Sequence, residues 1–233
     1  MKNIRVVLIA LLIFAFGTAR GQDTLKAERT SIITLSLLTP TFSYAPRYNV
    51  GYMQKVAPRW WVGIEAGYGN RDITFGMAAS GGTDYIDNDY RFFEVRPEVY
   101  YSLRNHGKVK HLVSAEFFYI NHTDHFTNGK YYGKDSYPEY RYDEADYKRI
   151  KTGLNINYSL FFYFSPRVGL IWKTGFGVKY RDVTYSNVDN ARLVDNSSDD
   201  EIFDIFNTEK HIEQSGSQFG GNFNMDLKLF YKF

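Results

Sequence analysis

An alternation of apolar and polar residues in the stretch GGNFNMDLKLFYKF (220–233) is the feature that most restricts the fold of this chain. From Phe223 to Phe233 every second residue is apolar, and the residues between them are mostly Asn, Asp and Lys. Side chains of a β-strand point alternately to opposite faces of a sheet, so the pattern predicts a strand with one oily and one polar face. The pattern runs through to Phe233, whereas the ends of soluble domains usually fray into water.

The same alternation recurs in three earlier stretches: EVRPEVYYSL (94–103), IKTGLNINYSLFFYF (150–164) and VGLIWKTGFGVKY (168–180). Aromatic residues make up 18% of the chain, yet the mean hydropathy is only −0.40. Such a composition fits sheets with one apolar and one wet face. A soluble β-sandwich would also alternate, but it rarely opposes its buried aliphatic face with so many charges. The pattern favours a membrane barrel. Pro97, which cannot donate a ladder hydrogen bond, predicts a local irregularity in its strand.

The first 21 residues have the layout of a secretory signal peptide. Lys2 and Arg5 precede the apolar run VVLIALLIFAF (6–16), and Ala19 and Gly21 are small residues suited to cleavage before Gln22. A buried N-terminal helix is the alternative. We expect 22–30 to be a short periplasmic segment. The chain has no Cys, which excludes a disulfide scaffold, and a formal net charge of +2 gives no reason to expect nucleic acid.

Eight strands are predicted in residues 31–233, near 31–44, 47–56, 60–70, 90–103, 110–121, 148–164, 168–181 and 217–233. Short turns at 57–59, 105–110 and 165–167 alternate with connections that include three long ones, at 71–89, 122–147 and 182–216. Later stretches lack the roughly 20 apolar residues of a membrane helix, so a membrane protein of this sequence must be a barrel. The prediction is an all-β fold: an eight-stranded antiparallel transmembrane β-barrel with short periplasmic turns and long extracellular loops.

An even strand count places both termini in the periplasm of a Gram-negative bacterium, with the barrel in the outer membrane. The least certain division is at SYAPRY (43–48). If residues 31–56 formed one bent strand, the count would be seven and this parity would fail.

Several motifs resemble the small outer-membrane barrels of Bacteroidetes, notably the DUF3575-type family, among barrels of the OmpA and OmpW type. They are Asn49-Val50-Gly51, Trp60-Trp61, Gly67-Tyr68, Arg96-Pro97-Glu98-Val99-Tyr100 and SPRVGLIWKTGFGVKY (165–180). The resemblance implies a fold and a compartment only. Resemblance to outer-membrane proteins also implies that Leu229, Tyr231 and Phe233 form a signal for the barrel-assembly machinery, and that outer-membrane lipid surrounds the chain.

Strand parity directs ten charged side chains into the lumen. An eight-stranded interior is only wide enough for side chains, so these charges are expected to form a neutralising network. A narrow gated path for a small polar solute is the alternative. The ten residues are Glu65, Glu94, Arg96, Glu98, Glu116, Lys151, Lys173, Lys179, Asp226 and Lys228.

The long loops are the second candidate site, as an extracellular surface for an unidentified envelope protein or glycan. Tyrosine offers an apolar face with a polar tip, although these tyrosines could also simply line an extended hairpin. The acidic run DNSSDDE (195–201) could bind Ca²⁺, but it lacks EF-hand spacing, so a solvated loop is preferred. The candidate surface comprises Tyr131, Tyr132, Tyr137, Tyr140, Tyr142, Asp199, Asp200 and Glu201.

An enzyme is not expected. A lipid A-modifying activity would need a histidine at the outer rim, for which His122 and His125, near Thr123 and Asp124, are the candidates; His211 lies in the last loop. No nucleophile motif accompanies them. The predicted role is structural or accessory, or extracellular interaction within an envelope complex, without cofactor or metal. A small-solute channel and a lipid A-modifying enzyme are the alternatives.

Overall fold

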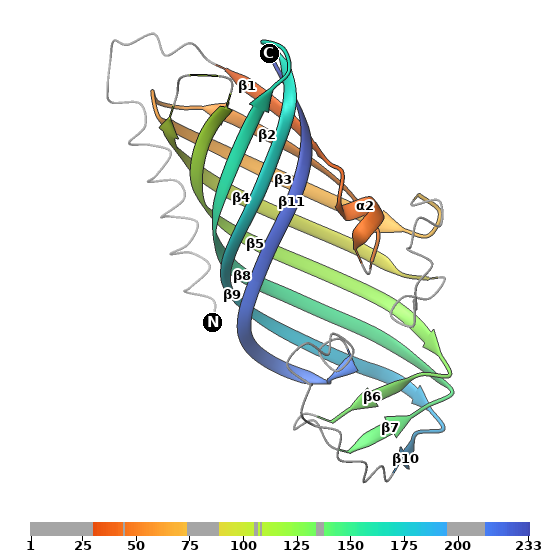
Figure 1. Cartoon of the computed structure of the whole chain (residues 1–233). Helices are drawn as coiled ribbons and strands as arrows, with labels where there is room; N and C mark the ends of the chain where they lie inside the picture. Colours follow the sequence, from red (N-terminus) through yellow and green to blue (C-terminus); the bar gives the residue numbers. More distant parts are fainter. Residues whose placement is uncertain are drawn as a thin grey trace, which may run out of the picture.

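The computed structural model of this chain describes residues 30–43, 45–73, 89–104, 107, 109–133, 138–194 and 213–233. The predicted signal peptide and residues 22–29 lie outside the described residues. Eight antiparallel strands close into a barrel in the order β1-β11-β9-β8-β5-β4-β3-β2 (Figure 1). Their bounds are β1 Ser31–Ser36, β2 Tyr48–Lys55, β3 Trp60–Asn70, β4 Arg91–Arg104, β5 Val109–Thr127, β8 Glu144–Tyr163, β9 Val168–Asp189 and β11 Gly216–Lys232. The predicted all-β, eight-stranded barrel is confirmed.

The pairing of β11 with β1 closes the barrel. The two strands run antiparallel from Ile32 opposite Lys232 to Ser36 opposite Lys228, and Ser31 and Phe233 exchange two backbone hydrogen bonds of 3.1 and 3.0 Å. On its other side β11 pairs with β9 from Gly216 to Tyr231, whereas its pairing with β1 covers only the end of the alternating stretch. There the closing pair removes the open strand edge.

The division at SYAPRY is confirmed as two strands, because β1 and β2 pair with each other antiparallel. The predicted first strand, 31–44, is too long. The strand ends at Ser36, and Thr39–Phe42 form a short helix, α2. Pro40 explains the difference, since proline lacks the N–H that a sheet requires and its fixed φ suits the first turn of a helix.

The irregularity expected at Pro97 is small. The pairing of β4 with β5 skips Arg96 and Pro97 without a change of register, and the register shift lies further on, between Ser102 and Arg104. Pro97 therefore interrupts the hydrogen-bond ladder between β4 and β5 but leaves their register unchanged.

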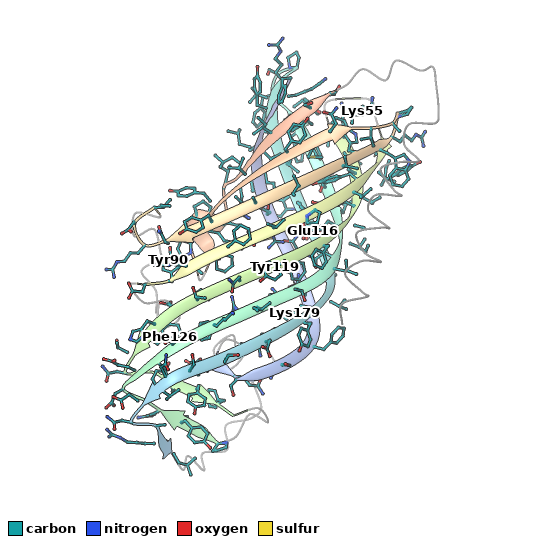
Figure 2. The ribbon with its side chains drawn as sticks, turned by 180° about the vertical axis from the view of Figure 1, so that it is seen from behind. Lys55, Tyr90, Glu116, Tyr119, Phe126 and Lys179 are labelled. Carbon is teal, nitrogen blue, oxygen red and sulfur yellow. The ribbon has the colours of Figure 1, made fainter. Side chains whose placement is uncertain are left out.

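Short turns gather at one end of the barrel, which we call the turn end. There β2 and β3 are joined by residues 56–59, β8 and β9 by 164–167, and the amide of Lys232 donates to the carbonyl of Arg167. In Figure 2 Lys55 lies at this end, Phe126 at the opposite end, and Glu116 between them. Among the described residues, no helix combines the length and the apolar character needed to cross a membrane.

At the opposite end, which we call the wall end, the strands β5, β8 and β9 extend beyond the other strands. We call these extensions, together with the small sheet described below, the wall. β5, β8 and β9 have 19, 20 and 22 residues, about twice the roughly 9–11 that cross a bilayer. A small sheet continues from them in the order β10-β7-β6, formed by Arg192–Val194, Glu139–Arg141 and Lys130–Tyr132 (Figure 1). Much of the predicted loops 122–147 and 182–216 is thus strand. The sequence reading ended these strands too early, because their outward side chains become polar there while the strand itself continues.

The outer face shows where that change occurs. Along β5 the outward residues pass from Phe117 and Tyr119 to Asn121, Thr123 and His125. Along β9 they pass from Phe176, Val178 and Tyr180 to Asp182 and Thr184. Below this level the barrel carries a belt of exposed large apolar side chains, among them Ile156 at 67% and Phe176 at 72% exposure. An exposed apolar belt of this extent is typical of a surface that contacts lipid.

Candidate functional site in the barrel interior

An apolar ring crosses the interior near the turn end, beside a cavity of about 130 Å³ that Lys55 and Lys110 also line. Each of the eight barrel strands contributes one buried side chain to a single cluster, so the ring spans the whole cross-section. The phenol of Tyr100 sits at its boundary and donates to Glu98 at 2.6 Å. Strand parity alone puts Ile171 and Phe230 on the inner face, but it does not show that the eight side chains meet. Its members are Ile32, Met53, Trp61, Tyr100, Leu112, Phe161, Ile171 and Phe230.

Above the ring, Lys173 joins two carboxylates. Its Nζ lies 2.6 Å from Glu98 and also contacts Glu116. Glu98 further accepts from Ser114 at 2.5 Å and from Asn157 at 3.1 Å. All three charged side chains are at most 4% exposed, so the hydrogen bonds replace nearly all of their water. A buried carboxylate is tolerated only with such partners.

A second group of charges lies on the side of β11. Lys228 contacts Glu65 and lies 3.5 Å from Asp226. Asp226 accepts a hydrogen bond of 2.7 Å from Ser36 of β1, across the closing pair of strands. These contacts link β11 to β1 and β3 inside the barrel, next to the pair of strands that closes it.

The third group centres on Glu94, which is fully buried. Arg47 and Arg96 donate to its two oxygens at 2.9 and 3.0 Å, and Arg96 also reaches Glu116 at 3.0 Å. Arg47 was missed by sequence reasoning, although it shares the strand parity of the inward residues Asn49 and Met53. Within the described residues, eight of the ten predicted lumen charges are thus joined by ion pairs, most of them between different strands.

Lys151 and Lys179 point inward as predicted, but within the described part of the chain neither forms an ion pair with a carboxylate. Arg149 and Arg181, each 5% exposed, lie beside them on β8 and β9. These four side chains form a cation block toward the wall end. Parity would have revealed Arg149 and Arg181, because both fall on the inner face of predicted strands.

Tyrosines of the wall pack against one another. Tyr131 stacks on Tyr140 and Tyr185 with ring centroids 5.1 and 4.8 Å apart. Tyr142 is 4% exposed, and burial raises the pKa of its phenol well above the usual range. Tyr142 therefore belongs to internal packing and not to an exposed surface, whereas Tyr132 and Tyr140 are half-exposed. Tyr137, Asp199, Asp200 and Glu201 lie outside the described residues.

The rim histidines are separated by the strand. His122 is buried between Phe92 and Tyr147, with Nε2 3.7 Å from Asp124. His125 faces outward, and its Nδ1 lies 2.8 Å from Asp146. The hydrogen bond to Asp146 raises the pKa of His125, and the same bond lowers the pKa of Asp146. The two rings cannot act on one substrate, since they lie on opposite faces. In the portion of the chain that the structure describes, no group of three metal-ligating side chains occurs.

No family model matches the chain, and no curated protein matches it. The resemblance to the DUF3575-type family thus stays a prediction.

Two solved structures are similar in part. A major outer membrane protein from Thermus thermophilus has 11% sequence identity and a TM-score of 0.48, over 89% of this chain and 100% of that chain. Neisserial surface protein A has 9% sequence identity and a TM-score of 0.33, over 88% of this chain and 96% of that chain. Likeness at this level does not extend to function.

Proposed function

We propose that the chain is an outer-membrane β-barrel with a closed lumen, whose role is structural or accessory and whose wall is its extracellular contact surface. The apolar ring carries this proposal. One side chain from every strand meets at the turn end, and water and ions would have to displace a dry cluster to pass. The ion pairs above the ring neutralise one another at a second level, where the cavity between them is only about 70 Å³.

The apolar belt supports a lipid environment for the barrel. Trp60 and Trp172 are 48% and 37% exposed on the outer face, and Trp61 is 8% exposed inside. Exposed aromatic rings of this kind are typical of the interfaces of membrane barrels.

Lipid contact is tested with three single-tryptophan variants reconstituted into vesicles that contain brominated lipid. We expect strong quenching for Trp60 and Trp172 and weak quenching for Trp61, which is the internal control. Equal quenching of all three would contradict the assignment of faces. No quenching of any would contradict the membrane location.

The closed lumen is tested by conductance in planar bilayers. We expect the wild-type barrel to show no stable conductance steps, because buried side chains from all eight barrel strands meet in the ring. A double variant, Ile171→Ala with Phe230→Ala, removes two members of the ring and serves as the opened control. Regular conductance steps from the wild-type protein would favour the solute channel instead.

Orientation is tested with epitope tags. A tag beside Asn190, in the turn from β9 to β10, is expected to be labelled on intact cells. A matched tag at Pro166, in the turn from β8 to β9, is expected to be labelled only after the envelope is permeabilised. The reverse pattern would place the wall in the periplasm and remove the extracellular contact role.

A further inference from the structure

The cation block has an arrangement that the proposed function does not explain. In the register of β8 and β9, Lys151 lies directly opposite Arg181, and Lys179 lies opposite Gly153. Arg149 is the next inward residue of β8 toward the wall end, so four positive side chains occupy neighbouring inward positions on two strands. Like charges directly opposite each other destabilise a sheet. The same number of positive charges could be spread over eight strands, yet they are gathered on two.

Between the apolar ring and the block, the positive charges have carboxylate partners, which distinguishes this middle level of the lumen from the block. Around Lys173 and Lys228, each ammonium group has two carboxylates in contact. Toward the wall end the inner face of β5 carries Asp124, near His122, but the described residues give Lys151 no ion pair with a carboxylate, and its Nζ lies over the ring of Phe118, 5.3 Å from its centroid. A ring face offers a cation far less than a carboxylate in a desolvated site.

A cavity lies beside the block. It has a volume of about 200 Å³, and the charged side chains that line it are Arg47, Arg96, Arg149 and Lys151. Asn222 and Asn224 add amide groups. The volume far exceeds the roughly 10–15 Å³ that one water needs, and it is below the roughly 300–1,000 Å³ of pockets for larger organic ligands. Within the described residues, its lining contains no acidic side chain.

The neighbouring cavity toward the turn end provides a contrast. Its volume is about 70 Å³, and Arg47 and Arg96 line it as well, but there they face Glu65, Glu116 and Asp226. The two arginines therefore mark the boundary between a neutralised half of the lumen and a basic half. Their guanidinium groups are held by Glu94, so they are fixed in place at that boundary.

We propose that this basic cavity binds a small oxyanion, such as inorganic phosphate, between Arg149, Lys151, Arg47 and Arg96. Guanidinium and ammonium groups converge on it, and arginine forks match the oxygens of phosphate and carboxylate. Bound there, the anion supplies Lys151 with the carboxylate-like partner that the described residues do not give it. The cavity also reaches β11, where Phe223 and Met225 line it beside Asn222 and Asn224.

The experiment is a calorimetric titration of the full-length protein in dodecyl maltoside, whose sugar head group carries no phosphate. Sodium phosphate is the titrant at pH 7, and sodium chloride at the same ionic strength is the reference. We expect saturable binding of one phosphate per barrel. Lys151→Gln is expected to weaken binding at least tenfold, while Lys151→Arg keeps the charge and is expected to stay within about threefold.

Lys110→Gln is the matched control. Lys110 is also a half-buried lysine of the interior, placed over the ring of Tyr163 at 4.7 Å, but it lies at the turn end beside the apolar ring. This variant is expected to bind phosphate as the wild type does. Each variant is first checked for the heat-modifiable gel shift of a folded barrel, so that loss of folding is not read as loss of binding.

Three results would overturn or redirect the proposal. The proposal would be refuted if the titration with phosphate released no more heat than the titration with chloride. It would also be refuted if Lys110→Gln weakened phosphate binding as much as Lys151→Gln does. If phosphate binds only after the six carboxylates of residues 195–212 are replaced by amides, the chain itself supplies the counter-charge and the proposal fails. If phosphatidylglycerol added to the micelles competes with phosphate, the site stands and a lipid head group is its source; without competition, the source is a free anion.

Discussion

Replacing Lys173 by Gln is the most informative test of the interior, because this one ammonium group holds two buried carboxylates. Glu98 and Glu116 both contact its Nζ, and both are at most 4% exposed. Glutamine keeps a polar side chain of similar reach but removes the positive charge. The two carboxylates would then face each other across the gap.

The expected cost follows from that geometry. Two carboxylate oxygens that share one ammonium nitrogen lie about 4 Å apart, and at an effective dielectric constant of about 20 two like charges at this distance repel by about 4 kcal/mol. Removing one partner of a buried ion pair typically costs about 3–5 kcal/mol. Ser114 and Asn157 still donate to Glu98, and Arg96 still donates to Glu116. We therefore expect a loss of about 3 kcal/mol in the free energy of unfolding, at the lower end of this range.

Reversible urea unfolding of the barrel in vesicles, followed by tryptophan fluorescence, measures this loss. Adding Glu98→Gln to Lys173→Gln removes one of the two facing charges and is expected to recover about 2 kcal/mol. Lys55→Gln, at the rim of the turn end, is the control and is expected to change the stability by no more than about 0.5 kcal/mol. A loss below about 1 kcal/mol for Lys173→Gln, or a double variant less stable than the single one, would refute the reasoning.

Two further predictions concern the strands and the wall. Gly153→Val is expected to prevent folding, because a Cβ at this position would overlap the backbone oxygen of Val178; Gly221→Ala, with open space around it, is expected to fold normally, and refolding yields measured by gel shift distinguish the two. For the pair of His125 and Asp146, the raised pKa of His125 means that its contribution is complete below about pH 6.5 and is lost as pH rises through the folded value. The lowered pKa of Asp146 means that its contribution is lost as pH falls through a value below 3.8. NMR titration of His125 is expected to show a raised midpoint that Asp146→Asn returns toward 6.5, and an unchanged midpoint would contradict the hydrogen bond.

The outer and inner faces of the barrel could be assigned from the sequence because they depend only on local geometry. A strand alternates its side chains with a period of two, so Glu98, Lys173 and Asp226 could be directed inward without knowing which strands pair. The same rule would have found Arg47 and Arg149. The error at residues 31–44 has a local cause as well, since Pro40 is visible in the sequence and disfavours a strand.

The sequence by itself determined the all-β fold, the strand count and which side chains face inward or outward, because these follow from periodicity along the chain. Tertiary structure alone decided which charges meet. Lys173 reaches Glu98 and Glu116 across 75 and 57 residues of sequence, a contact set by the stagger of strands around a closed barrel. The apolar ring has the same origin, because one residue from each strand reaches the same level only when the barrel closes. The basic cavity likewise joins residues of β4, β5, β8 and β11, which no local pattern brings together.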